Sequence, residues 1–358
     1  MSPPAGPIDA GDPATASVLA FQGGGFLAYF SALMACRIEE MIPGRQPGAS
    51  VAGHFDLLAG TSAGSIIAAG LAAGLTASAI ARIMQQNGEK IFPRRKILAT
   101  APGILGARFS PKPLRDILTA ILGDRRLGDL DHALLIPTIN ESLGKPEIFR
   151  SYDPDQAHIS VVDVVLASAA APTYLPRHKI GDHHYADGAL VANGPALLAA
   201  HDLSQRFRIP FNAQRIVTIG TTTTPPQRSW RQRFTSWGVG GWFAPPPRLL
   251  ELMLGGQVEL QAKLLAGLAP MELVTLDDHL TPEEARHVHM VLADARARKV
   301  LEDVAGRCAD GVTPETRDKL HRILSRRRRH PAFEDVPGTG EKRPVLIRRP
   351  EILPHPPA

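Results

Sequence analysis

The sequence predicts an α/β fold, with a mainly parallel central sheet, helices on both of its faces and a helical C-terminal extension. Between residues 17 and 220, short apolar runs bounded by glycine or proline alternate with stretches of helical period. The chain has 358 residues, 44% of them hydrophobic, so it can bury the large core that such a sheet needs.

The first predicted strand, Ser17 to Phe21, runs into three consecutive glycines, Gly23, Gly24 and Gly25. From Ala28 to Met41 apolar residues recur at three and four positions, which predicts an amphipathic helix. Consecutive glycines can turn several N–H groups outward at a helix N-terminus, where they suit a phosphate or an oxyanion. No Gly-Lys-Ser/Thr sequence follows and no acidic residue lies between residues 42 and 54, which disfavours a nucleotide site. We therefore expect these glycines to form an oxyanion hole.

Ser62 lies in a G-x-S-x-G element that runs from Gly60 to Gly64, between an apolar stretch and a predicted helix. Gly60 and Gly64 would let the flanking strand and helix approach closely while the serine occupies a sharp turn. The helix N-terminus would favour a developing negative charge beside the hydroxyl. The element also occurs in turns that have no chemical role, so the hypothesis of a nucleophile depends on a partner base.

Asp187 is the candidate base, in an Asp187-Gly188-Ala189 element preceded by Tyr185 and Ala186. A serine hydroxyl is a poor nucleophile until a base takes its proton, and a carboxylate in apolar surroundings has a raised pKa that suits this task. Aspartate before glycine is also a common turn. The alternative is a Ser-Asp-His triad, in which a histidine follows the aspartate. The candidates for that histidine are His201, His279, His287 and His289.

The remaining elements continue the alternation. Helices are predicted at 76–89, 114–122 and 160–171, and strands at 133–139 and 215–220. Residues 92–113 mix bases, prolines and hydrophobics, typical either of a lipid-contacting rim or of an ordinary basic loop. Further helices are predicted at 249–268, at 281–304 with Thr281 as cap, and from residue 312 to Arg329, before a loosely ordered end.

These patterns predict four parts. They are a flexible tail (1–17), a catalytic domain (18–224), a helical extension packed on it (225–310) and a basic, proline-rich tail (311–358). Two cysteines and scattered histidines predict neither a disulfide framework nor a metal site. No signal peptide or transmembrane span is recognisable, so we expect a cytoplasmic protein. The net charge of +5 leaves contact with anionic surfaces open.

Four elements in this order resemble those of patatin-like phospholipases: Gly23–Gly25, Gly60–Gly64, Ser168–Pro176 and Asp187–Ala189. The resemblance covers about residues 18 to 220 and implies a patatin-like three-layer sandwich. It implies Ser62 as nucleophile, Asp187 as base in a dyad without histidine, and the glycine loop as oxyanion hole. It also implies phospholipid hydrolysis without a cofactor, at the inner face of the membrane. Leu27 and Ala28 depart from the family, which commonly has a basic residue and a glycine there; this puts head-group contacts in doubt.

The start of the chain, its length and its helical extension also resemble the phospholipase effectors of cyclic-oligonucleotide anti-phage systems. That resemblance implies a role in antiviral defence and a cyclic dinucleotide activator, with no nucleic-acid polymer as partner. Two alternatives stay open, a binding module whose C-terminal third senses a ligand and an inactive fold kept for interaction. The oligomeric state is also left open.

Overall fold

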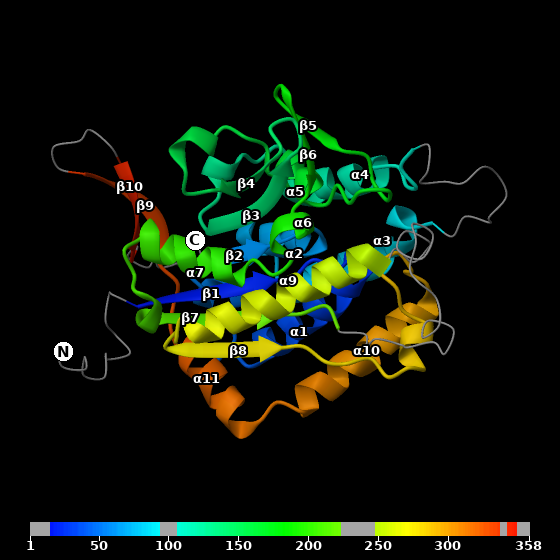
Figure 1. The fold of residues 1–358 in the computed structure, drawn as a ribbon. Helices are drawn as coiled ribbons and strands as arrows, with labels where there is room; N and C mark the ends of the chain where they lie inside the picture. The colour runs from blue at the N-terminus through cyan, green and yellow to red at the C-terminus, as the bar shows by residue number, and fades with distance from the viewer. Residues whose placement is uncertain (1–14, 94–105, 223–247, 337–341, 349–358) are drawn as a thin grey trace, which may run out of the picture.

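The computed structural model describes residues 15–93, 106–222, 248–336 and 342–348, and its main feature is one mixed sheet (Figure 1). In the described residues the sheet has eight strands in the order β5-β6-β3-β2-β1-β7-β8, with β4 paired to β3. The parallel strands are β1 (Ala16–Phe21), β2 (Leu57–Gly60), β3 (Ala133–Asn140), β7 (Gln214–Ile219) and β8 (Glu272–Leu276). Antiparallel pairing adds β4 (Lys145–Arg150), β5 (His178–Ile180) and β6 (His183–Asp187). The predicted α/β fold with a mainly parallel sheet is confirmed.

Alternate residues of the parallel strands face two separate cores. Leu19 and Phe21 belong to one core, whereas Val18 and Ala20 belong to the other. The first core contains α1 (Ala28–Glu40), α2 (Ala63–Ala72), α3 (Ala77–Ile91), α4 (Lys112–Leu122), α5 (Val161–Ser168), α10 (Ala295–Asp310) and α11 (Pro314–Leu324). The second contains α7 (Ala196–Gln205) and the end of α9 (Arg248–Gly267), which cross the other face (Figure 1). Strands covered on both faces are expected to be nearly all apolar, and β1 and β2 are buried throughout, with Ser17 of β1 as their polar residue.

The expectation of one helix from Thr281 to Val304 is wrong. Thr281 does cap a turn, since its hydroxyl accepts the Glu284 N–H at 3.2 Å and its own N–H donates to the Glu284 carboxylate at 2.7 Å. The turn ends as a short 3-10 helix, Glu284–Arg286, and the chain then runs irregularly to Asp294. The Asp294 side chain accepts the Ala297 N–H at 2.8 Å and starts α10 as a new helix. The caps at Thr281 and Asp294 therefore begin two separate helices, where the sequence pattern predicts one.

The C-terminal part is more ordered than predicted. The helix expected to reach Arg329 ends at Leu324, and the chain expected to be loose forms a hairpin of β9 (His330–Asp335) and β10 (Lys342–Ile347). Arg329 is 6% exposed, and its backbone N–H donates to Asp56 Oδ1 at 2.7 Å while its guanidinium contacts the same carboxylate. The arginine run, Arg326–Arg329, is thus partly a structural clamp on the start of β2.

Residues beyond 224 also build the sheet itself. β8 pairs in parallel with β7 over five residues, from Arg215 opposite Glu272 to Ile219 opposite Leu276. A boundary after residue 224 would divide two neighbouring strands of one sheet, so the extension and the catalytic part share a core.

We predict that Arg329→Met lowers the melting temperature, because it leaves the buried Asp56 carboxylate without its cation. Removing one partner of a buried ion pair costs about 3–5 kcal/mol of unfolding free energy. For a chain of this size, that loss lowers the melting temperature by roughly 5 °C. Arg327→Met, at an exposed position of the same run, is the matched control. Calorimetry that shows equal melting of the two variants would contradict the clamp.

Candidate active site

Ser62 occupies the sharp turn between β2 and α2. Its backbone φ is 52° and ψ is −125°, a strained geometry for a residue with a side chain. A Cβ on Gly60 would lie 2.3 Å from the Gly64 carbonyl oxygen, and one on Gly64 would lie 2.5 Å from that of Phe21. Both predicted glycines are therefore required sterically, and their closeness holds the serine at the end of the helix.

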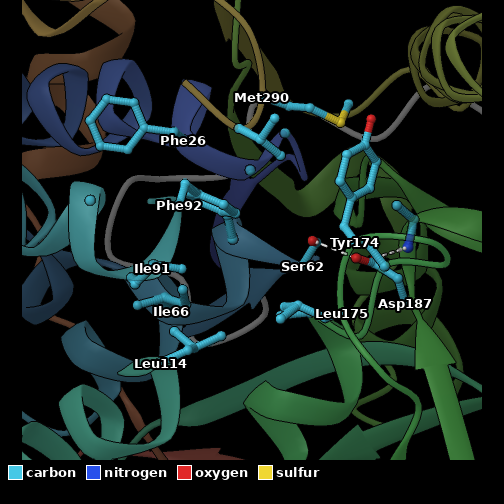
Figure 2. Close-up of a pocket in the computed structure, with 18 of the residues that line it drawn as sticks. Phe26, Ser62, Ile66, Ile91, Phe92, Leu114, Tyr174, Leu175, Asp187 and Met290 are labelled. Atoms are coloured by element: carbon cyan, nitrogen blue, oxygen red, sulfur yellow. Dashed lines mark hydrogen bonds between the residues drawn. The ribbon is translucent and has the colours of Figure 1, made fainter. Parts of the chain in front are cut away.

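Asp187 is brought to Ser62 by the order of the strands. It ends β6, which pairs with β3, and β3 pairs with β2, which leads to the serine. The Ser62 hydroxyl donates to Asp187 Oδ2 at 2.7 Å, and Asp187 Oδ1 accepts the Ala189 N–H at 2.8 Å (Figure 2). The two side chains face each other at the carboxyl end of the parallel strands.

The surroundings of Asp187 favour the protonated carboxyl. Asp187 is 3% exposed, and burial raises its pKa to about 7, although the hydrogen bonds from Ala189 and Ser62 act in the opposite direction. A carboxylate with a pKa near neutrality accepts a proton far better than an exposed aspartate does. The arrangement can therefore take a proton from the serine hydroxyl directly.

Ser168 fixes the backbone of the serine turn, and sequence reasoning assigned it no role. Its hydroxyl accepts the Ser62 N–H at 3.0 Å and donates to the Pro137 carbonyl at 2.8 Å. A Cβ on Gly188 would lie 2.0 Å from that same carbonyl oxygen, which explains the glycine after Asp187. Both contacts span distant parts of the chain, so no local pattern signals them.

The glycine loop lies beside the serine, but its three N–H groups are not equivalent. The Gly23 N–H donates to the Asn193 carbonyl at 3.0 Å and is therefore engaged. Within the described parts of the chain, the N–H groups of Gly24 and Gly25 have no hydrogen-bond partner, and neither has that of Ala63. All three residues line the cavity that contains Ser62. Candidate oxyanion donors are therefore Gly24, Gly25 and Ala63, rather than all three glycines.

The irregular segment before α10 holds the glycine loop in place. Gly25 has a φ of 58°, and the next N–H, that of Phe26, donates to the Met290 carbonyl at 2.7 Å. A Cβ on Gly25 would lie 2.2 Å from this carbonyl oxygen. The C-terminal extension thus contacts the loop directly.

The cavity beside Ser62 has a volume of about 110 Å³ and is almost wholly apolar (Figure 2). Its apolar lining includes Phe26, Ile66, Ile83, Met84, Ile91, Phe92, Leu114, Ile117, Leu175, Leu250, Leu254, Met290 and Val291. Such a lining suits a hydrocarbon chain and offers few partners to a polar ligand.

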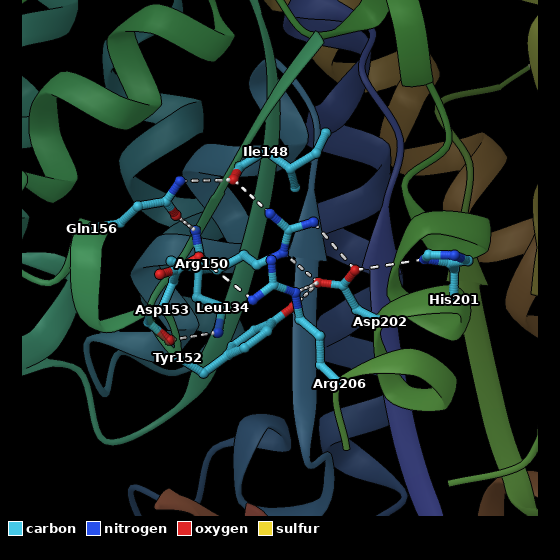
Figure 3. A network of polar contacts seen from close by, with 10 residues as sticks. Leu134, Ile148, Arg150, Tyr152, Asp153, Gln156, His201, Asp202 and Arg206 are labelled. Atoms are coloured by element: carbon cyan, nitrogen blue, oxygen red, sulfur yellow. Dashed lines mark hydrogen bonds and ion pairs between the residues drawn. The ribbon is translucent and has the colours of Figure 1, made fainter. Parts of the chain in front are cut away.

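None of the candidate triad histidines is among the residues that line this cavity in the described structure. His201 lies on α7 beside Asp202, in a polar network with Arg150 and Tyr152 (Figure 3). Both oxygens of Asp187 are already engaged, with Ser62 and Ala189. The geometry favours the dyad over the triad.

Two further features concern the described residues alone. Within them, no three His, Cys, Asp or Glu side chains are grouped so that they could share a metal ion. Of the helices in this part of the chain, none combines the length and the apolar character needed to cross a bilayer.

Residues 19–200 match the family model described as patatin-like phospholipase. The chain belongs to this family. It is 31% identical over 285 residues to a cGAMP-activated phospholipase of Pseudomonas aeruginosa, which covers 76% of this chain and 81% of that protein. It is 29% identical over 321 residues to a cGAMP-activated phospholipase of Vibrio cholerae, with 81% and 88% covered. Among solved structures, VipD from Legionella pneumophila aligns over 83% of this chain and 67% of its own, at 12% identity and a TM-score of 0.39. The resemblance stated from the four sequence elements is confirmed at the level of the family.

We predict that Asp187→Asn melts at a higher temperature than the parent at pH 8. Burial holds the pKa of Asp187 at about 7, against an ordinary value of 3.8, so ionised Asp187 destabilises the folded state. This cost is absent below about pH 4, grows up to about pH 7 and is constant above it. The free-energy cost of ionised Asp187 is at most about 4 kcal/mol. Its removal should raise the melting temperature of Asp187→Asn at pH 8 by roughly 5 °C.

The measurement is calorimetry of both proteins across this pH range. The variant's advantage should be largest at pH 8 and shrink as the pH falls towards 4. A variant that melts at or below the parent temperature at pH 8 would show that the carboxylate is not held at a cost.

A second prediction is that Gly25→Ala lowers kcat by roughly 10²-fold, because a side chain there must displace the Met290 carbonyl and turn the loop N–H groups. Gly44→Ala is a matched control, since Gly44 has a similar φ of 61° and a Cβ there would meet nothing within 4 Å. Turnover of a soluble short-chain ester compares them. Equal kcat values would mean that the loop is only a tight turn.

Proposed function

We propose that this chain is a serine-dependent lipid acyl hydrolase of the phospholipase A type, which cleaves acyl esters of membrane phospholipids. The observation that carries the proposal is the 2.7 Å hydrogen bond from Ser62 Oγ to Asp187 Oδ2 beside an apolar cavity. A nucleophile with an adjacent base, facing a cavity that suits a hydrocarbon chain, matches the requirements of acyl-ester hydrolysis.

In the first half of the proposed reaction, Asp187 takes the Ser62 proton as Oγ attacks the ester carbonyl carbon. The negative charge that develops on the carbonyl oxygen is stabilised by N–H groups of the glycine loop and of Ala63. The intermediate then collapses, the bond to the lysophospholipid oxygen breaks, and Asp187 returns the proton to that oxygen.

In the second half, water attacks the acyl-serine. Asp187 accepts the proton of the water as its oxygen bonds to the acyl carbon, and the second intermediate is held by the same N–H groups. Collapse breaks the bond to Ser62, the serine recovers its proton from Asp187, and the fatty acid leaves. Every step uses groups of the chain and water, so no cofactor takes part in the proposed reaction.

Activation by a cyclic dinucleotide is the second part of the proposal. It is supported by the relatives of this chain that are named cGAMP-activated phospholipases. A direct contact joins the C-terminal extension to the glycine loop, at the Met290 carbonyl and the Phe26 N–H. A ligand that moved this segment would move the oxyanion donors, so activity would respond to it. A role in antiviral defence is part of the same proposal.

We also propose that the protein acts peripherally, at the cytoplasmic face of the membrane. Two basic clusters of the chain, Arg94–Lys96 and Arg326–Arg329, do not support this by themselves. Arg94, Arg95 and Lys96 lie outside the described residues. Arg329 is buried against Asp56, which precedes β2, whereas Ser62 follows the other end of that strand. Docking through the arginine run would turn the catalytic cavity away from the bilayer.

The test is hydrolysis of phospholipid vesicles by the purified chain, with and without cGAMP, followed as released fatty acid and lysophospholipid. We expect release that cGAMP increases, the same release by Ser78→Ala at an exposed serine of α3, and none by Ser62→Ala.

Each part of the proposal has its own contrary result. Release by folded Ser62→Ala would overturn the nucleophile. Turnover of soluble esters without any release from vesicles would overturn the lipid substrate. Release that is indifferent to cGAMP would overturn the activator.

A further inference from the structure

Helix α9 turns large apolar side chains towards solvent. The four residues are Leu252 (47% exposed), Met253 (46%), Leu260 (58%) and Leu264 (50%), and we call them the α9 outer face. In the part of the chain that the structure describes, only three other large hydrophobic side chains are so exposed, and none of them lies on a helix. Exposed apolar side chains that gather on one helix indicate a contact surface, whereas single exposed hydrophobic residues scattered over a protein are ordinary.

The middle of the α9 face that meets the protein is held by polar contacts, between the apolar Leu254 and Leu265. The Gln257 amide donates to the Leu190 carbonyl at 3.0 Å, and the Gln261 amide accepts the Gly194 N–H at 3.1 Å. Leu265, 3% exposed, anchors the end of the helix. An ordinary surface helix buries its apolar stripe and exposes its polar one. Gln257 and Gln261 of α9 instead face the protein, while Leu260 and Leu264 are exposed, so folding alone does not account for the outer face.

The outer face also lacks net charge. Among the described side chains of α9, the charged ones are Glu259 and Lys263, and they pair with each other at 3.1 Å. A surface that served an acidic or basic partner would carry an excess of one sign. This surface fits an apolar environment instead.

The same helix forms part of the catalytic cavity. Leu250 and Leu254 line that cavity together with Ser62, and Leu252 and Met253 lie between them on the exposed side. Within one turn of α9, therefore, the apolar lining of the cavity adjoins the apolar outer face. Figure 1 shows the helix along the outside of the molecule, beside α7.

We propose that the α9 outer face inserts into the interfacial region of a phospholipid bilayer and places the catalytic cavity against the membrane. The inference rests on the proposed function, since the acyl chain of a bilayer lipid must reach Ser62. A bilayer accounts for the neutral apolar face and for its continuity with the cavity, whereas a second copy of the chain accounts only for the first. Because the outer face carries no net charge, its insertion into a neutral bilayer depends on apolar area and not on salt.

The test variant is Leu260→Glu/Leu264→Lys. Neither residue lines the cavity, both replacements keep helix propensity, and the new pair is spaced i, i+4 in the favourable order. The net charge does not change. Leu143→Glu/Phe333→Lys makes the same replacements at two exposed positions elsewhere, 51% and 43% exposed, and is the matched control.

The primary measurement is sedimentation with neutral phosphatidylcholine vesicles in high salt, with and without cGAMP. We expect the parent and the control to sediment with the vesicles. The α9 variant should bind them at least about tenfold more weakly. Turnover of a soluble ester should be equal in all three proteins, while fatty acid release from vesicles should fall in the α9 variant alone.

Equal vesicle binding by the α9 variant and the parent would overturn the proposal. So would an oligomer, measured by light scattering, that the α9 variant converts to a monomer, because the occupant would then be a second copy. A lower melting temperature of the α9 variant without lipid would show that the chain itself covers this face. If the parent turns over neither soluble esters nor lipid, the proposed function fails, and vesicle binding still decides the role of α9.

Discussion

The hydrogen bond between Ser62 and Asp187 is the contact on which the rest of the site depends. Asp187 ends β6 and Ser62 lies in the turn after β2, so the bond requires β6 to pair with β3, and β3 with β2. Ser168 connects the same regions a second time, through the Ser62 N–H and the Pro137 carbonyl. The sheet thus fixes the base and the nucleophile at hydrogen-bond distance before any substrate arrives, which is the preorganisation that catalysis needs.

This geometry is held at a cost to stability. Ser62 has a backbone conformation that side chains rarely adopt, and Asp187 is a carboxyl buried almost completely. Both costs favour reactivity, since strain exposes the hydroxyl and burial raises the pKa of its base. The two apolar cores and the Arg329–Asp56 clamp at the opposite end of β2 supply the rigidity that keeps these groups in place.

The sequence identified the parts of the site that have local patterns and missed those that depend on distant backbone. Gly60 and Gly64 frame Ser62 within five residues, and Gly188 follows Asp187, so these were predicted. The bond from Gly23 to the Asn193 carbonyl and that from Phe26 to Met290 involve main-chain groups, which leave no trace in residue type. The Thr281 cap has a local pattern, since Glu284 follows three residues later, and it was predicted. The end of that helix at Arg286 has no such pattern and was missed. An arginine run resembles a solvated tail whether or not one member, Arg329, is buried.

The most direct test of the dyad is the rate at which a fluorophosphonate labels the protein as a function of pH, with the modified residue located by mass spectrometry. A serine activated by Asp187 predicts a single adduct on Ser62, at a rate that rises with pH to a plateau with a midpoint near the Asp187 pKa of about 7. Asp187→Asn should label at a small fraction of that rate at every pH, while alanine variants of His201, His279, His287 and His289 should label normally. Rapid labelling of Ser62 in Asp187→Asn, or its loss in any one histidine variant, would contradict a serine–aspartate dyad.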